Sequence, residues 1–95
     1  MILEGVIDQT RISLGGGNYI IGKEGNVNGD YFQAYNFVSR RHAYLKVDQS
    51  GAMVKDISTN GTMINEARIK TGEWVSLHDG DNIRFADADL CVSLC

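Results

Sequence analysis

A hydroxyl, two guanidinium groups and an imidazole stand in four consecutive positions, Ser39-Arg40-Arg41-His42. Apolar residues flank this segment on both sides, so we expect a polar loop that the core holds at each end. An arginine offers a fork of charged donors and a serine adds a short O–H bond, which together suit an anion with several oxygens. Taken alone, the segment is explained more simply as a solvated surface turn, because arginines are mostly exposed.

Two further loops carry side chains of the same kind. Lys23 lies between glycines in residues 22–25, and Thr59 and Asn60 lie in residues 58–62. Lysine brings a point charge and threonine a hydroxyl, whereas the amide of asparagine matches the donor and acceptor that an extended peptide backbone offers. Gly61 permits the positive φ that we expect in this turn. The three loops together predict a site for an anion such as phosphate.

Short alternating segments separated by turn residues are expected to position these loops. The chain has eleven glycines and no proline, so glycine supplies most of the turns. The clearest pair is residues 42–47 and 52–57, which alternate with period two around a turn at 48–51 and predict an antiparallel hairpin. Further strands are expected at residues 2–7, 11–14, 19–21, 62–65, 67–69, 74–77, 82–85 and 89–94.

About ten such strands predict an all-β fold, a two-sheet antiparallel β-sandwich with loops gathered at its ends. No segment shows a sustained helical period. Residues 31–38 are rich in aromatic side chains but are expected to be irregular, ending in a short strand before Ser39. The predicted core consists of Ile21, Val38, Leu45, Val47, Val54, Ile57, Ile64, Val75, Leu77, Ile83, Phe85 and Val92.

The length of 95 residues predicts a single domain spanning residues 1–95, which its small size suggests is a module of a larger protein. The formal net charge of −3 argues against a nucleic-acid partner, which needs a basic field. No apolar run is long enough to span a bilayer, so no membrane partner is expected. The polar residues after Met1-Ile2-Leu3 do not resemble a signal peptide.

The two cysteines are expected to be free thiols. On a strand, Cys91 and Cys95 would lie on one face about 13 Å apart, too far for a disulfide. Free thiols without an export signal predict a cytoplasmic location. The histidines and cysteines include no close ligand pair, so no metal site is predicted, and no cofactor is expected. Nothing near His42 completes a nucleophile and base pair, so the chain is not expected to be an enzyme.

Four motifs in order resemble those of the forkhead-associated (FHA) domain. They are Gly22-Lys23, Ser39-Arg40-Arg41-His42, Asp56-Ile57-Ser58-Thr59-Asn60-Gly61-Thr62 with Asn65, and Leu77-His78-Asp79-Gly80-Asp81 with Ile83. Each motif alone is weak, but all four at this spacing are specific, and they extend from about Ile20 to Phe85. The resemblance implies an FHA-like sandwich of about eleven short strands that binds phosphothreonine-containing proteins through loops at one end.

The resemblance also implies a role for each matching residue. Ser39 and Arg40 would bind phosphate oxygens, Thr59 would contribute its hydroxyl or backbone, and Asn60 would hold the peptide main chain. His42 would tie the loops together from beneath. Gly61 and Thr62 would shape the turn that Asn65 braces. Gly22 would support the site.

One departure from the family pattern leaves an alternative open. The family usually has arginine where this chain has Lys23, which keeps the charge but loses the bidentate fork. Arg40 could compensate for this loss. The alternative is a degenerate FHA-like sandwich that docks or assembles with proteins independently of phosphate, through its aromatic stretch or a sheet face. Most of the aromatic residues at 31–37 are expected in the core, although some could line a peptide groove. The oligomeric state is left open.

Overall fold

The computed structural model describes residues 1–94, which form ten strands and one short helix. The strands are β1 (Ile2–Gly5), β2 (Arg11–Ser13), β3 (Gly17–Ile21), β4 (Ala43–Asp48), β5 (Gly51–Asp56), β6 (Thr62–Ile64), β7 (Ala67–Arg68), β8 (Trp74–Leu77), β9 (Asn82–Phe85) and β10 (Ala88–Ser93). The helix, α1, spans Gly29–Gln33.

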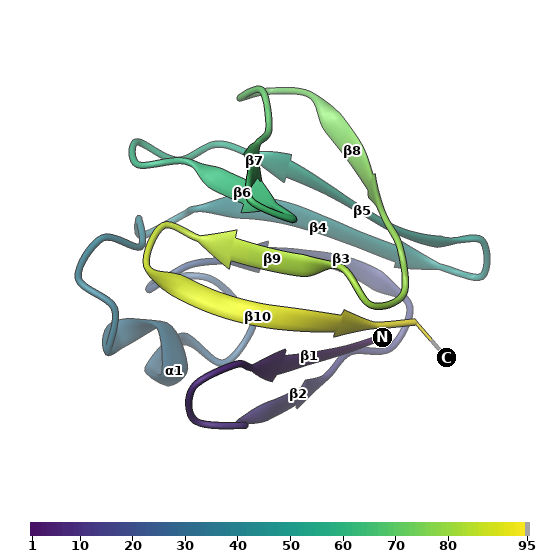
Figure 1. Cartoon of the computed structure of the whole chain (residues 1–95), viewed down its shortest axis with the longest axis horizontal. Coiled ribbons are helices and arrows are strands. Elements are labelled where there is room, and N and C mark those ends of the chain that lie inside the picture. Colours follow the sequence, from purple (N-terminus) through teal and green to yellow (C-terminus); the bar gives the residue numbers. More distant parts are fainter. Residues whose placement is uncertain (95) are drawn as a thin grey trace.

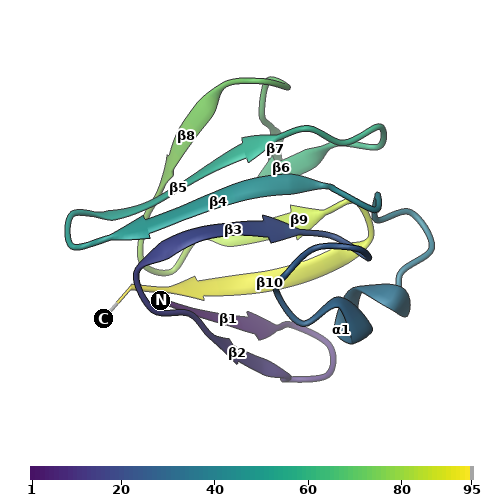
Figure 2. The same ribbon diagram turned by 180° about the vertical axis from the view of Figure 1, so that it is seen from behind.

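The strands form two antiparallel sheets packed face to face. The six-stranded sheet has the order β2-β1-β10-β9-β6-β7, and the four-stranded sheet has the order β3-β4-β5-β8. Figure 1 looks onto the six-stranded sheet, and Figure 2 looks onto the four-stranded sheet from behind. The predicted β-sandwich is therefore confirmed. The described residues form ten strands and not eleven, because residues 36–38 form turns in place of the short strand expected before Ser39.

The hairpin of β4 and β5 follows the predicted pattern. Its register runs from Ala43 opposite Asp56 to Asp48 opposite Gly51. Alternate residues of β4 are buried, beginning with Ala43, and alternate residues of β5 are buried from Ala52 onward. Successive side chains on a strand point to opposite faces, so each strand turns one face to the other sheet and the other face outward.

The core contains nine of the twelve residues predicted for it. The remaining three, Ile57, Ile64 and Val75, are only half-buried. Val75 lies on β8, an edge strand, and Ile64 lies beside the edge strand β7, so neighbouring strands cover them incompletely. The core also includes residues that were not predicted, which are Leu3, Ile12, Val27, Phe32, Ala43, Ala52, Ala88 and Leu90.

Helix α1 differs from the irregular structure expected for this part of the chain. Its five residues make little more than one turn, so no apolar period can develop. Phe32 is fully buried, and its ring meets Phe85 edge-on with 6.0 Å between the centroids. Tyr31 and Tyr35 pack against the core and approach each other through their hydroxyls at 3.2 Å. Three of the four aromatic residues in this stretch therefore support the core, and only Phe37 is exposed.

Strands β1 and β10 pair along the whole length of β1, from Ile2 opposite Ser93 to Gly5 opposite Leu90. The turn between β9 and β10 follows Phe85 and precedes Ala88. Ile2 and Ser93 therefore lie at the end of the sandwich opposite this turn. In Figure 1 the start of β1 is on the right, and the loops before β4 and after β5 are on the left.

Three further findings concern membrane-spanning helices, metal sites and the cysteines. No helix within residues 1–94 is long and apolar enough to cross a membrane. Over the same residues, no group of three or more His, Cys, Asp or Glu side chains is placed to hold a metal ion. Cys91 carries a free, exposed thiol, whereas Cys95 and its expected distance from Cys91 lie outside the described residues.

Candidate functional site

Three loops leave the four-stranded sheet at the same end. Ile21 at the end of β3 pairs with Ala43 at the start of β4, which in turn pairs with Asp56 at the end of β5. The loops at 22–25, 39–42 and 58–61 therefore begin from one line across the sheet. This register places the three loops at the same end of the sandwich, as predicted.

The first two loops are joined through their backbones at Gly22. The Lys23 N–H donates to the carbonyl of Ser39 at 3.2 Å, and the Glu24 N–H donates to that of Arg40 at 2.9 Å. Gly22 has a φ of +148°, and a Cβ there would collide with these same two carbonyl oxygens. Only glycine lets the loops approach so closely, so Gly22 supports the position of Ser39 and Arg40.

His42 joins the second loop to the third from within the core. Its Nδ1 accepts from the Ser39 N–H at 3.0 Å, so the proton sits on Nε2, which donates to the Gly61 carbonyl at 2.8 Å. Burial lowers the pKa of His42, against the opposing effects of the Gly61 carbonyl and the charges of Asp56 and Asp87. The imidazole is therefore held neutral as a bridge between the two loops.

The third loop is built around the buried carboxylate of Asp56. Its Oδ1 accepts from the hydroxyls of Ser58 at 2.6 Å and Thr62 at 2.8 Å, and its Oδ2 accepts from Thr71 at 2.7 Å. Burial alone would raise the pKa of Asp56, but these bonds outweigh it and the pKa is lowered. The Ser58 hydroxyl also accepts from the Gly61 N–H at 2.8 Å. An ionised Asp56 thus fixes both ends of the loop that carries Thr59 and Asn60.

The polar side chains predicted for the site meet on this framework. The half-buried Ser39 hydroxyl accepts from the Thr59 N–H at 3.4 Å, which leaves its own proton free to donate. Asn60 is exposed, and its Nδ2 donates to the Phe37 carbonyl at 2.9 Å. No partner for its Oδ1 is found within residues 1–94, so one acceptor and one N–H of the amide remain open to a ligand. Phe37 and Asn60 also line an open pocket of about 270 Å³, together with Ala86 and Asp87.

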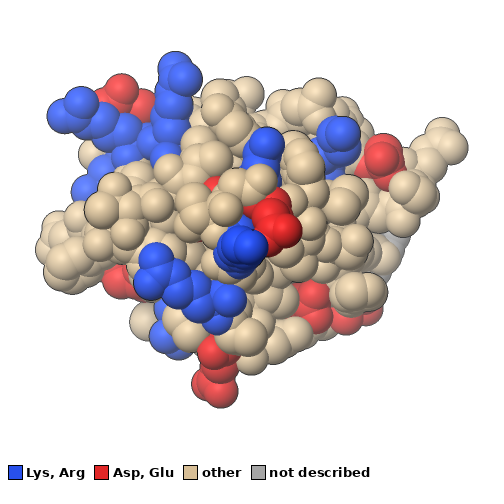
Figure 3. All heavy atoms as spheres, turned by 90° about the horizontal axis from the view of Figure 1, so that it is seen from above, with Lys and Arg blue, Asp and Glu red and all other residues tan. Residues whose placement is uncertain are grey.

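The positive charges of the site come from Lys23 and Arg40. Lys23 Nζ donates to the Asn36 carbonyl at 3.3 Å, and Arg40 Nε lies 3.3 Å from a carboxylate oxygen of Glu24. Both members of this ion pair are largely exposed, so the pair is weak and can be exchanged for another anion. Figure 3 shows Lys and Arg side chains gathered at the left end of the face it views, with an acidic side chain among them.

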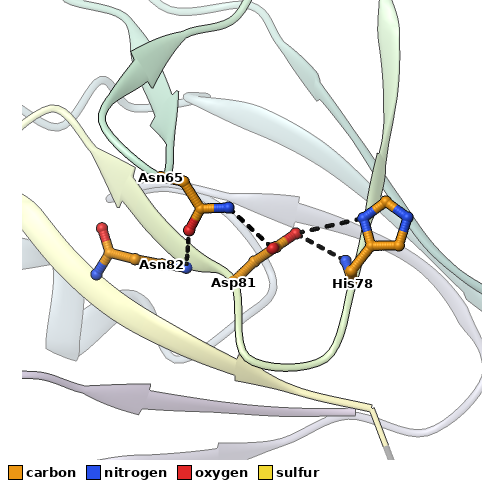
Figure 4. A network of polar contacts seen from close by, with 4 residues as sticks. All are labelled: Asn65, His78, Asp81 and Asn82. Atoms are coloured by element: carbon orange, nitrogen blue, oxygen red, sulfur yellow. Dashed lines mark hydrogen bonds and ion pairs between the residues drawn. The ribbon is translucent and has the colours of Figure 1, made fainter.

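Asn65 is the one predicted site residue that the structure places elsewhere. Its Nδ2 donates to Asp81 at 2.9 Å, and its Oδ1 accepts from the Asn82 N–H at 2.9 Å. Asp81 in turn accepts from the His78 N–H at 2.7 Å, as Figure 4 shows. This network joins the β6–β7 turn to the β8–β9 turn. Both hydrogen bonds of the Asn65 side chain therefore go to the start of β9 and the turn before it, and neither goes to residues 58–61.

Two residues near the loops were not singled out from the sequence. Asp56 could have been recognised as a capping acid from the hydroxyl residues Ser58 and Thr62 that follow it, but its bond to Thr71 depends on the fold. Nothing in the sequence around Arg68 indicates that it lies beside the third loop. Its guanidinium lies over Gly61, where a Cβ would come within 2.9 Å of Nε. This contact adds a further positive charge beside the third loop.

Comparison with known proteins gives results of two kinds. A family model described as the FHA domain matches residues 19–86. Among solved structures, an FHA domain from a structural and functional analysis of phosphothreonine-dependent FHA domain interactions is 29% identical, with a TM-score of 0.83 over 99% of this chain and 95% of the other. The FHA domain of human APLF, in complex with an XRCC1 bisphospho peptide, is 25% identical, with a TM-score of 0.81 over 99% and 97%.

A third structure is similar in fold alone. The N-terminal FHA domain of S. cerevisiae Rad53p, in complex with a phosphothreonine peptide, reaches a TM-score of 0.82 over 99% of this chain and 92% of the other, at 16% identity. A search of curated proteins found no match.

Proposed function

Because the chain belongs to the FHA-domain family, we propose that it binds protein segments containing phosphothreonine and so mediates phosphorylation-dependent protein–protein interactions in signalling. FHA domains are interaction modules, and we propose that this chain likewise acts by binding and is not an enzyme. The observation that carries the proposal is the convergence of Lys23, Ser39, Arg40 and Asn60 on three loops that hydrogen bonds join at one end of the sandwich.

The phosphate would bind between the second and first loops. A phosphothreonine carries a charge of about −1.5 to −2 at pH 7 and three strong acceptor oxygens. Ser39 can donate its free hydroxyl proton, Arg40 its guanidinium, and Lys23 the N–H groups that Asn36 does not use. Arg40 must first leave Glu24, which costs little because both side chains are exposed.

The peptide main chain would bind beside the phosphate, at Asn60. The bond from Asn60 Nδ2 to the Phe37 carbonyl restrains the exposed amide and leaves its Oδ1 and one N–H for the peptide main chain. Charge-assisted hydrogen bonds contribute about 1.5–3 kcal/mol each. Two or three of them, with the main-chain and groove contacts added and the cost of ordering the peptide subtracted, correspond to micromolar affinity at most, a binding free energy of about −8 kcal/mol.

Calorimetry with a phosphothreonine peptide library tests the proposal. Ser39→Ala and Arg40→Ala are each expected to weaken binding by about 1–3 kcal/mol while the fold stays intact. Arg11→Ala is the matched control, because it removes a similar exposed pair, between Arg11 Nε and Glu4 at 3.5 Å. Binding that survives phosphatase treatment of the peptide would overturn the proposal and favour phosphate-independent docking, for which the comparisons offer no support.

We also propose that the domain works in the cytoplasm. The free, exposed thiol of Cys91 supports this location, because such thiols persist in reducing compartments. Fluorescence microscopy of the tagged full-length protein would test it, and a signal confined to an oxidising compartment would contradict it.

A further inference from the structure

The outer face of the four-stranded sheet carries a cluster of aromatic, aliphatic and basic side chains. In the register, Ile20 on β3 lies opposite Tyr44, Tyr44 lies opposite Lys55 on β5, and Lys55 lies opposite Trp74 on β8. Residues that alternate with these, such as Leu45 and Val54, are buried between the sheets. The cluster therefore points outward, on the face turned toward the viewer in Figure 2.

Two ammonium groups lie over the indole ring of Trp74. Lys55 Nζ is 5.0 Å and Lys46 Nζ is 5.4 Å from the ring centroid, and Lys55 is also 5.7 Å from the centroid of Tyr44. Neither lysine forms an ion pair with a carboxylate anywhere in residues 1–94. The nearby Asp48, on β4, accepts instead from the Ser50 hydroxyl at 2.6 Å. The two ammonium groups thus lie over π faces, and no carboxylate within residues 1–94 is close enough to either of them to form an ion pair, although the charge of Asp48 acts on Lys46 from a greater distance.

A groove runs beside this cluster. Its volume is about 390 Å³, and its apolar wall includes Ile20, Tyr44 and Trp74, with Asn18, Asn26 and Lys46 among the polar residues. No aspartate or glutamate lines it, although the chain has twelve acidic residues against nine basic ones. None of the loop residues 39–42 or 58–62 lines it either. The groove is therefore a positive, partly apolar site that is separate from the three loops proposed to bind phosphopeptide (residues 22–25, 39–42 and 58–61, here called the phosphopeptide loops).

We propose that this surface, here called the Trp74 face (Ile20, Tyr44, Lys46, Lys55 and Trp74), docks an acidic segment of a partner protein. Carboxylates of the segment would pair with Lys46 and Lys55, and an aliphatic or aromatic residue between them would fill the groove against Trp74. Charge complementarity selects this occupant. A nucleic acid would need more cations than two within a molecule of net charge −3, and it would leave the apolar wall unused.

Tryptophan fluorescence tests the docking directly, because Trp74 is the sole tryptophan of the chain. The probes are unphosphorylated synthetic peptides in which glutamates flank a central pair of leucines or phenylalanines. The control peptides carry glutamine in place of each glutamate. We expect a saturable change in Trp74 emission with at least one acidic peptide and none with its glutamine counterpart. Amide chemical-shift changes should map to β3, β4, β5 and β8.

Matched variants separate this surface from the rest of the molecule. Lys46→Glu combined with Lys55→Glu keeps the fluorophore and should weaken acidic-peptide binding about tenfold or more, equivalent to about 1.4 kcal/mol. Arg11→Glu combined with Lys70→Glu makes the same change in net charge elsewhere and should leave binding unchanged. Ser39→Ala should also leave it unchanged, and phosphothreonine-peptide binding should survive the double substitution at Lys46 and Lys55.

Several results would overturn the proposal. They are the absence of a saturable response to every acidic peptide, an equal loss in the Arg11 and Lys70 control, and a loss in Ser39→Ala, which would assign the binding to the phosphopeptide loops. An equal response to a single-stranded oligonucleotide would mean that the face binds polyanions in general. Concentration-dependent sedimentation that Trp74→Ala abolishes would mean that a second copy of the chain occupies the face.

Discussion

The close approach of the first two loops at Gly22 leads to a sharp prediction for Gly22→Ala. The added methyl would meet the carbonyl oxygens of Ser39 and Arg40, both of which are backbone atoms that cannot swing away. The loops would have to separate, and the hydrogen bonds from Lys23 and Glu24 to those carbonyls would lengthen or break.

The size of the effect follows from two contributions. A non-glycine residue held at a φ of +148° carries backbone strain of about 1–3 kcal/mol. Crowding against the two carbonyls adds roughly 1–3 kcal/mol, as overpacking does in protein cores. Gly51→Ala carries the first contribution alone, because Gly51 has a φ of +135° with nothing within 4 Å of the new Cβ, so the difference between the two variants measures the second. Gly22→Ala should therefore be less stable than Gly51→Ala by about 1–3 kcal/mol.

Urea unfolding followed by circular dichroism would measure this difference. A domain of this size loses about 4–8 °C in Tm for each kcal/mol, so thermal scans should rank the variants in the same order. Phosphopeptide affinity should fall in Gly22→Ala and stay unchanged in Gly51→Ala, because only the former displaces Ser39 and Arg40. Equal stability of the two variants, with equal affinity, would show that the Gly22 contact does not position the loops.

Other predictions concern the residues that hold the loops and the charge that they present. His42→Ala should lower both the Tm and phosphopeptide affinity, since the imidazole bonds to Ser39 and Gly61; loss of affinity alone, in calorimetry and thermal scans, would contradict this bridging role. Burial lowers the pKa of His42 below its ordinary 6.5, so at this position the unfolded chain binds a proton more readily than the folded chain does. The contribution of the neutral imidazole to the free energy of unfolding should therefore be full above about pH 6.5 and should decline as the pH falls. Urea midpoints of the wild type should accordingly fall from pH 7 to pH 5 more steeply than those of His42→Gln, and parallel profiles would refute the assignment. Asp56→Asn should cost about 2–3 kcal/mol in urea unfolding, because one oxygen that accepts from hydroxyls becomes a donor; an unchanged midpoint would mean that Asp56 does not organise the third loop. Lys23→Arg should preserve or raise affinity in the same calorimetry, because the guanidinium adds a fork of donors, and a clear loss would remove Lys23 from the phosphate site.

The strands could be predicted largely from local pattern. In β4 and β5 the alternation of buried and outward-facing residues is strict, and β8 and β9 have the bounds that their apolar residues and flanking turns indicated. The convergence of the three loops also follows from adjacent antiparallel strands. Helix α1 could not be predicted in this way, because five residues are too few to show a period and its position depends on Phe32 reaching Phe85.

The contacts within the site were less accessible from the sequence. The motif order predicted which side chains would gather, but not that Arg40 would lie against Glu24 or Arg68 against Gly61. These contacts depend on loop conformation and on residues from separate strands. The bonds of Asn65 were not accessible either. The family resemblance implied that Asn65 braces the turn of the third loop, whereas the hydrogen bonds of its side chain go to Asp81 and to the N–H of Asn82.

The pairing of Ile2 with Ser93 places both possible attachment points of the domain side by side. A tag, a surface or a neighbouring domain joined at either residue is held at the opposite end of a body whose longest dimension is 32 Å, so it leaves the phosphopeptide loops unobstructed. The same proximity makes a circular permutant feasible, in which a short linker joins the two residues and a cut in an exposed turn creates new ends.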